Sequence, residues 1–358
     1  MIIIDSHLDL AWNALNWNRD LTQPVAEIRR LEAQMKEEHR GGNTVSFPEM
    51  RKGEVAICLA TLLARASGLG EANLDFRTRE AASAMARGQL AYYRIMANDG
   101  WLRMLKSWRD VEAHLQEWQQ PGGDSTPLGF ILSMEGADPI LSPADVAGWW
   151  DDGLRVVGPA HYGVSAYAHG TGVSGGLTGQ GTDLFKAMDE AGMVLDVTHL
   201  ADESFWQALE IFKGPVLASH NNCRVLVPGE RQFSDEQIRC LIERGSVIGV
   251  ALDSWMLYPG YDPGKTPNSL VNLEAVADHI DHICQLAGNA RPVAIGSDLD
   301  GGFGTEQSPH DLDTIADLQK IPAILRQRGY TETDIEAVIH GNWLRFFREA
   351  WKGLRASG

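Results

Sequence analysis

Residues 193–200 read MVLDVTHL and residues 215–222 read PVLASHNN, and these two short stretches decide the fold class of the chain. Each is an apolar run that ends in a histidine, and a segment with helical periodicity lies between them. Strands that are apolar on both faces and alternate with amphipathic helices are typical of a parallel sheet covered by helices. The two stretches therefore predict an α/β fold in which neighbouring strands each carry a histidine at the carboxyl end.

Six further apolar runs of this kind bring the number of expected strands to eight. They lie at residues 2–5, 55–60, 129–134, 154–158, 246–252 and 292–297. Helical patterns follow two of the later runs, at 235–245 and at 273–288, and the second ends in Gly288, a common helix stop. Eight strand–helix units predict a (β/α)8 barrel of the TIM type, and we expect residues 1–358 to form this single domain.

Two long connections are expected to elaborate the barrel, after the first and the second strand. Residues 12–52 are interpreted as an insertion that contributes to a lid. Residues 65–128 are interpreted as a helical insertion, with two helices joined by a loop that contains Trp101. The glycine-rich stretch GVSGGLTGQG at 172–181 lacks the lysine of a phosphate-binding loop and is interpreted as a mobile active-site loop.

The overall composition excludes several classes of protein. The formal net charge of −17 argues against a nucleic-acid partner or a polybasic membrane contact. No run of 18 apolar residues occurs, and the start MIIIDSHLDL does not resemble a signal peptide, so no membrane partner is expected and the default location is cytoplasmic. The four cysteines have no C-x-x-C spacing and are expected to be free thiols.

Residues able to bind metal follow several of the expected strands. Active sites of such barrels lie at the carboxyl ends of the strands, so these residues are predicted to converge. They are His7 and Asp9 after the first strand, Glu135 after the third, and His199 and His220 after the fifth and sixth. His7 and Asp9 are two residues apart in extended chain, which places both on one side for a shared cation.

This set of residues predicts two metal ions. The two oxygens of Glu135 can bridge two cations, and neutral imidazole is the commonest protein ligand of zinc. Manganese or iron would accept the same ligands. Two cations can hold a hydroxide at neutral pH and polarise a carbonyl group, which fits the absence of a serine nucleophile motif or a zincin motif from the sequence.

The order of these motifs resembles that of the renal or membrane dipeptidase family of the amidohydrolase superfamily, over nearly the whole chain. The matching motifs are DSHLDL (5–10), SMEGAD (133–138), DVTHL (196–200), ASHNN (218–222), GSDLDG (296–301) and GNWLRFF (341–347). Two departures are Leu8, where the family commonly has Asn, and the run VVGPAH (156–161), which replaces a threonine-rich approach to the histidine.

The resemblance implies a role for each site residue. His7 and Asp9 would bind one zinc, His199 and His220 the other, and Glu135 would bridge them. His161 in GPAHYG would bind substrate and could donate a hydrogen bond to the developing oxyanion. Arg231, eleven residues after the second histidine, would hold the substrate's terminal carboxylate in bidentate fashion. The family likeness also suggests a homodimer.

An acid/base residue is expected after the last strand. Asp298 lies closest to the strand end and is the candidate for proton transfer and for contact with the substrate amine; Asp300 is the second candidate, since a two-residue separation sends both carboxylates toward the same side. Together these features predict a metal-dependent dipeptidase with two zinc ions. The alternatives are an amidohydrolase acting on an N-acyl amino acid or a lactam, and a metal-free barrel with a binding role.

Overall fold

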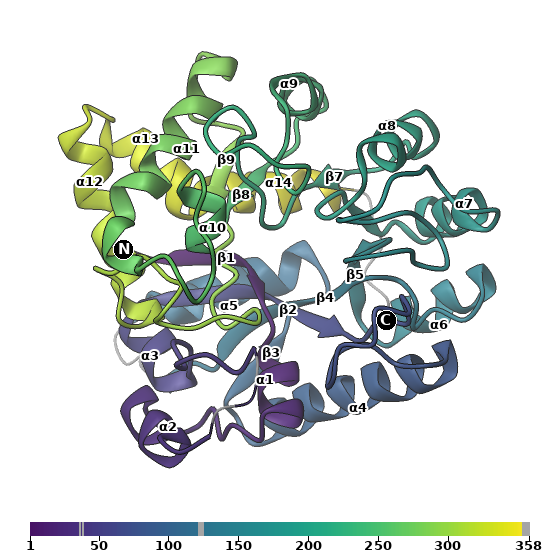
Figure 1. Cartoon of the computed structure of the whole chain (residues 1–358), viewed down its shortest axis with the longest axis horizontal. Coiled ribbons are helices and arrows are strands. Elements are labelled where there is room, and N and C mark those ends of the chain that lie inside the picture. Colours follow the sequence, from purple (N-terminus) through teal and green to yellow (C-terminus); the bar gives the residue numbers. More distant parts are fainter. Residues whose placement is uncertain (36, 38, 121–124, 353–358) are drawn as a thin grey trace.

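The predicted barrel is confirmed. The computed structural model describes residues 1–35, 37, 39–120 and 125–352, and in Figure 1 its parallel strands lie at the centre with helices around them. Eight strands form the ring, and a ninth, β3, lies beside it. The strands are β1 (Ile3–Leu8), β2 (Val55–Leu63), β3 (Leu102–Met104), β4 (Leu128–Glu135), β5 (Leu154–Gly158), β6 (Val194–Asp196), β7 (Val216–Leu217), β8 (Ile248–Val250) and β9 (Val293–Ile295).

The ring is closed partly by backbone pairing and partly by side chains. Six strands pair in parallel in the order β1-β2-β4-β5-β6-β7, β8 pairs with β9, and a bridge between Ala218 and Ile248 joins β7 to β8. Between β9 and β1 the connection comes from side chains: Ser6 Oγ donates to the carbonyl of Ile295 at 3.1 Å, and the N–H of Ser297 donates to Asp5 Oδ1 at 2.9 Å. The buried Asp5 therefore helps to close the barrel.

The barrel interior is packed so tightly that glycine is needed at Gly249 in β8 and at Gly296, directly after β9. A Cβ atom added to Gly249 would lie 2.1 Å from the carbonyl oxygen of Ser219, and one added to Gly296 would lie 1.8 Å from the same atom. Both would also lie within 2.6 Å of Ser6 Oγ. At this level of the barrel the space is thus filled by backbone atoms and by the small side chain of Ser6.

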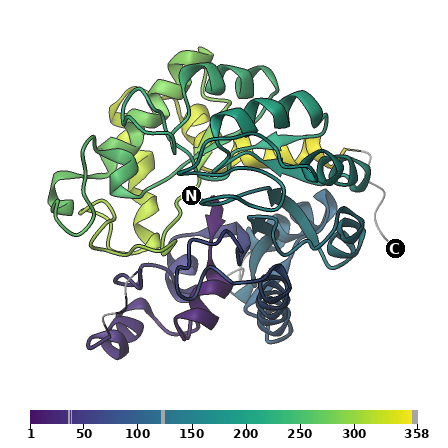
Figure 2. The same ribbon diagram turned by 45° about the vertical axis from the view of Figure 1, so that its right-hand side comes forward.

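Helices cover the outside of the barrel (Figures 1 and 2). Their ends follow local capping rules: Ser234 and Gln237 form a capping box at the start of α9, and Gly288, at φ 68°, ends α11. The helices are α1 (Leu10–Asn16), α2 (Val25–Glu32), α3 (Phe47–Lys52), α4 (Arg79–Asn98), α5 (Trp108–Trp118), α6 (Val146–Asp151), α7 (Gly181–Ala191), α8 (Asp202–Ile211), α9 (Asp235–Glu243), α10 (Ser254–Leu257), α11 (Leu273–Ala287), α12 (Ile321–Gln327), α13 (Glu332–Glu336) and α14 (Asn342–Ala350).

The connection between β2 and β4 differs in one respect from the prediction. It contains the two expected helices, α4 and α5, but the segment after Trp101 is the short strand β3 and not only a loop. β3 pairs with Leu128, Gly129 and Phe130, the first part of β4, whereas β5 pairs with β4 only from Leu132 onward. The strand therefore occupies an edge that β5 leaves open. Residues 121–124 of this connection lie outside the described part of the chain.

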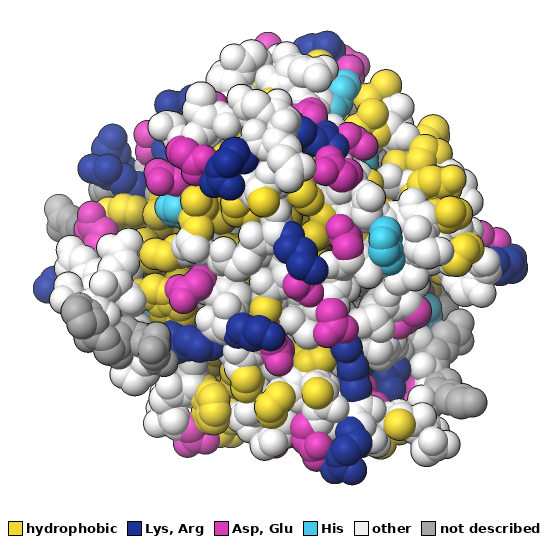
Figure 3. All heavy atoms as spheres, turned by 90° about the vertical axis from the view of Figure 1, so that its left-hand side faces the viewer, with side chains coloured by type: hydrophobic (Ala, Val, Ile, Leu, Met, Phe, Trp, Pro, Cys, Tyr) yellow, Lys and Arg dark blue, Asp and Glu magenta, His cyan; other side chains and the backbone are white. Residues whose placement is uncertain are grey.

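The surface does not present a single kind of side chain. On the face shown in Figure 3, acidic, basic and hydrophobic side chains are intermingled. Among the described residues, no helix combines the length and the apolar character that a membrane crossing requires.

Candidate active site

The residues predicted to bind metal come together at the carboxyl ends of the strands. His7 lies in β1 and Asp9 directly after it, and Glu135 is the last residue of β4. His199 and His220 each follow their strand, β6 and β7, by three residues. All five side chains are buried, although each carries polar atoms that need partners.

Two buried aspartates hold the strand ends that carry these side chains. Asp5 Oδ1 accepts hydrogen bonds from the N–H groups of His7 and Ser297, at 3.2 and 2.9 Å, and so ties the end of β1 to the end of β9. Asp196 Oδ1 accepts from the N–H groups of Thr198 and Ser219, both at 3.0 Å, and ties the end of β6 to that of β7. Neither aspartate was expected to have this role, because each lies inside a strand and reveals its partners only in three dimensions.

Glu135 stands between two groups of possible ligands. One of its oxygens, Oε1, lies 3.1 Å from His199 Nε2 and 3.3 Å from His220 Nε2. The other, Oε2, lies 3.5 Å from His7 Nε2, which in turn is 3.6 Å from Asp9 Oδ2. The carboxylate therefore faces the pair of histidines with one oxygen and the His7–Asp9 pair with the other, which is the arrangement expected of a bridging ligand.

The nitrogen and oxygen atoms of this cluster are arranged as metal ligands rather than as hydrogen-bond partners of one another. His7 Nε2, Asp9 Oδ1 and Glu135 Oε1 are buried and have no hydrogen-bond partner. The nitrogen and oxygen atoms of Glu135, His199 and His220 lie 3.1–3.3 Å apart. Two ligands of one tetrahedral zinc are separated by roughly 3.3 Å. Buried atoms that lack partners at this spacing indicate that the cluster can hold cations.

His199 and His220 each direct Nε2 toward Glu135, as metal binding at this site requires. Thr171 Oγ1 donates to the carbonyl of His199 at 3.3 Å and lies 3.0 Å from His199 Nδ1, so the hydroxyl accepts the Nδ1 proton. Ser219 Oγ lies 2.9 Å from His220 Nδ1. A partner on Nδ1 orients the ring and leaves Nε2 free as a ligand. Burial, together with the charge of Arg231, lowers the pKa of His199 well below its usual value, which favours the neutral ligand form.

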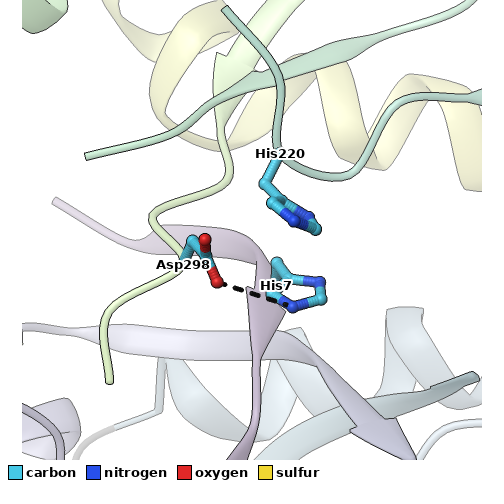
Figure 4. A group of neighbouring side chains, drawn as sticks. All are labelled: His7, His220 and Asp298. Atoms are coloured by element: carbon cyan, nitrogen blue, oxygen red, sulfur yellow. Dashed lines mark ion pairs between the residues drawn. The ribbon is translucent and has the colours of Figure 1, made fainter. Parts of the chain in front are cut away.

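Asp298 faces the cluster and Asp300 does not, so the expectation that both point to the same side was wrong. Asp298 Oδ1 lies 3.7 Å from His7 Nε2, as the dashed line in Figure 4 shows, and His220 lies next to them. Asp300 instead accepts hydrogen bonds from Asn43, Thr44 and Val45 at 2.5–2.9 Å.

The reason for this difference is the backbone. Asp298 and Asp300 have φ angles of 60° and 62°, in the left-handed region, so the alternation of an extended strand no longer applies. As a result, Asp300 links the connection after β1 to the end of β9. Asp298 instead lies buried at the cluster, and this burial raises the pKa of its carboxyl group well above the usual value.

His161 and Arg231 lie at the same cavity as the cluster. His161 Nε2 is 3.8 Å from Glu135 Oε1. Arg231 is buried, and its Nη2 donates to the carbonyl of His220 at 2.9 Å, whereas Nη1 has no partner. A buried guanidinium N–H without an acceptor costs free energy, so this atom is available to an anionic ligand.

The cavity has a volume of about 450 Å³, large enough for a small molecule of dipeptide size. Sequence reasoning missed several of its lining residues. They are Arg65, Tyr162, Asp253, Trp255, Met256, Phe303 and Gln307. Asp253 had a recognisable signal, because it directly follows the apolar run at 246–252. Burial raises its pKa to about 7, although Gln307 Nε2 donates to both of its oxygens at 2.8 and 2.9 Å.

Of the two segments expected at the active site, residues 12–52 reach the cavity and residues 172–181 do not. Trp12, Trp17 and His39, from the connection after β1, line the cavity. None of residues 172–181 is among its described lining residues; this glycine-rich stretch packs on α8, where Gly175 accepts from Ser204 Oγ at 3.0 Å and Leu177 donates to Gln207 Oε1 at 2.8 Å. Its interpretation as an active-site loop was therefore wrong.

Known proteins resemble this chain in sequence and in structure. Human dipeptidase 3 is 29% identical over 182 residues, which is 51% of this chain but only 35% of that protein. An uncharacterised protein of Klebsiella pneumoniae is 29% identical over 237 residues, 63% of this chain and 83% of that protein. A metallopeptidase from Rhodobacter sphaeroides, solved with a phosphinate mimic of the dipeptide L-Ala-D-Ala, has a TM-score of 0.79 at 21% identity.

Coverage of the structural relatives is nearly complete. The Rhodobacter match covers 98% of this chain and 99% of that one. The probable dipeptidase PvdM from Pseudomonas aeruginosa has a TM-score of 0.79 at 17% identity, over 98% of this chain and 96% of that one. The sequence model of the membrane dipeptidase family matches residues 1–356. The chain therefore belongs to the membrane dipeptidase family, peptidase family M19.

Proposed function

We propose that the chain is a dipeptidase with two zinc ions that hydrolyses the peptide bond of dipeptides with free termini. The observation that carries this proposal is the position of Glu135, whose oxygens face His199 and His220 on one side and His7 on the other. The family of the chain and the cavity of about 450 Å³ support a small peptide as substrate.

Bound cations would supply an activated water and polarise the carbonyl group of the scissile bond. His7 and Asp9 would hold one ion and His199 and His220 the other, with Glu135 shared. Three histidines and two carboxylates suit zinc, because imidazole nitrogen and carboxylate oxygen are both common ligands of this ion.

The protein's own residues would handle protons and position the substrate. Asp298, beside His7 and facing the cavity, would take a proton from the attacking water and deliver it to the leaving amine as the C–N bond breaks. Arg231 Nη1 would bind the terminal carboxylate. His161 would donate a hydrogen bond to the carbonyl oxygen as negative charge develops on it.

The test is metal removal and return. Protein stripped with a chelator should lose hydrolysis of a dipeptide library and regain it with zinc. His220→Gln should fail to regain activity, whereas His282→Gln, which changes a histidine paired with Asp235 outside the cluster, should behave like the unmodified protein. Activity that survives chelation would reject the metal mechanism.

Two further measurements separate the alternatives. An amidohydrolase of N-acyl amino acids or lactams would show zinc-dependent turnover of those compounds and not of dipeptides. A binding barrel would contain no metal by elemental analysis. The proposal also includes a homodimer and a cytoplasmic location, to be tested by light scattering and by cell fractionation.

A further inference from the structure

Arg65 is a buried cation close to the proposed catalytic groups, and it was not expected from the sequence. It lies two residues beyond Leu63, the last residue of β2, and Leu63 pairs in register with Glu135 of β4. Only 1% of Arg65 is exposed, yet it is one of the residues that line the cavity. A buried guanidinium in such a place requires specific partners.

The partners of Arg65 come from two segments of the cavity wall, one after β5 and one after β2. Nη1 lies 2.8 Å from Nδ1 of His161, and the guanidinium carbon lies 5.8 Å from the ring centre of Tyr162. Nη2 lies 2.5 Å from a carboxylate oxygen of Glu71, an ion pair whose geometry is not that of a hydrogen bond, and Glu71 also lines the cavity. The backbone of Arg65 is itself fixed, because its N–H donates to the carbonyl of Leu74 at 3.1 Å.

The contact with His161 has only one possible direction. A guanidinium donates hydrogen bonds and cannot accept them, and it stays protonated in proteins. Nδ1 of His161 must therefore be the acceptor, so a neutral His161 carries its single proton on Nε2. That nitrogen is on the Glu135 side, 3.8 Å from Oε1.

We propose that Arg65 is a positioning residue that holds His161 in the Nε2–H tautomer, so that this N–H points into the cavity as a hydrogen-bond donor for the substrate carbonyl oxygen. The inference rests on the proposed function for its catalytic consequence. In the other tautomer a lone pair on Nε2 would face the same oxygen and repel it. In this role Arg65 acts on the substrate through His161, and the double substitution described below separates this role from a direct contact.

Nitrogen NMR tests the tautomer independently of any turnover. In zinc-loaded protein with ¹⁵N-labelled histidine, the signals of His161, assigned by comparison with His161→Ala, should show a protonated Nε2 and an unprotonated Nδ1. A protonated Nδ1 would overturn the proposal even if dipeptides are hydrolysed, and the predicted spectrum would stand even if they are not.

Kinetics test the consequence. Arg65→Met should lower kcat for a dipeptide about 10- to 100-fold, with KM changed less than about threefold, because the lost contact acts on the transition state. In a His161→Ala background the same substitution should cost less than about twofold, since residues that act as a unit are not additive. Arg65→Lys, which keeps a donor, should recover part of kcat.

The matched control is Glu71→Gln, which removes the loop ion pair and leaves the His161 contact. It should keep kcat within about threefold of the unmodified protein. If Glu71→Gln is as damaging as Arg65→Met, or if Arg65→Met still costs tenfold without His161, Arg65 supports the loop or binds the substrate directly, and the proposal fails.

Discussion

Replacing Arg231 with Met should remove selection for a free carboxyl terminus. In the structure Nη1 of Arg231 is buried without a partner, while Nη2 donates to the carbonyl of His220. A substrate carboxylate would satisfy Nη1 with a charge-assisted hydrogen bond, which contributes about 1.5–3 kcal/mol. Since 1.4 kcal/mol is a factor of ten, kcat/KM for a free dipeptide should fall roughly 10- to 150-fold, mainly through a raised KM.

The assay compares each enzyme on a dipeptide and on its carboxyl-terminal amide. The unmodified enzyme should prefer the free acid by about the factor lost in Arg231→Met, and the variant should treat both compounds nearly alike. Arg231→Lys keeps the charge but not the planar guanidinium that contacts the His220 carbonyl and the substrate together, and it should be intermediate. If Arg231→Met lowers hydrolysis of the acid and the amide by the same factor, the guanidinium supports the fold or His220 and does not recognise the carboxylate.

Three further predictions concern the carboxylates. Glu135→Gln should reduce metal content from two ions to one or none per chain, measured by elemental analysis of the purified protein, because a neutral amide is a poor bridge; unchanged content would contradict this. Asp298→Asn should lower kcat about 10²- to 10⁴-fold with little change in the melting temperature, whereas Asp300→Asn should lower the melting temperature by several degrees through its lost contacts with residues 43–45. If Asp300→Asn lowered kcat and Asp298→Asn lowered the melting temperature, Asp300 would be the acid/base residue and Asp298 the structural one. Burial raises the pKa of Asp253 to about 7, above its unfolded value, so its carboxyl group favours folding at low pH and this contribution is lost as the pH rises through about 7. Asp253→Asn should therefore lose less stability than the unmodified protein between pH 5 and pH 7.5, as measured by urea unfolding. An equal loss in both proteins would contradict the assignment.

The ring of strands and the metal-binding cluster were predictable because both follow from local sequence. Apolar runs fix which segments are strands, and parallel strands place their carboxyl ends at one edge of the barrel. The residue after each run is therefore near the residues after the others, although they are far apart in sequence. For this reason the sequence predicts that His7, Glu135 and His220 lie close together, and their distances in the structure agree.

The remaining features depend on local backbone or tertiary context. The left-handed φ angles at Asp298 and Asp300 separate two side chains that strand alternation would place together. Arg65 lies beyond the run at 55–60, because β2 continues to Leu63, and its partner His161 is 96 residues away. β3 has only three residues and includes Arg103, so no apolar pattern marks it.

Anomalous diffraction at the zinc edge, on crystals of protein loaded with zinc, tests the central claim most directly. The account predicts two peaks per chain, one on each side of the Glu135 carboxylate, with His199 and His220 at the first and His7 and Asp9 at the second. The account would be contradicted if these five side chains were ordered and no anomalous peak lay among them, or if the peaks lay elsewhere in the chain.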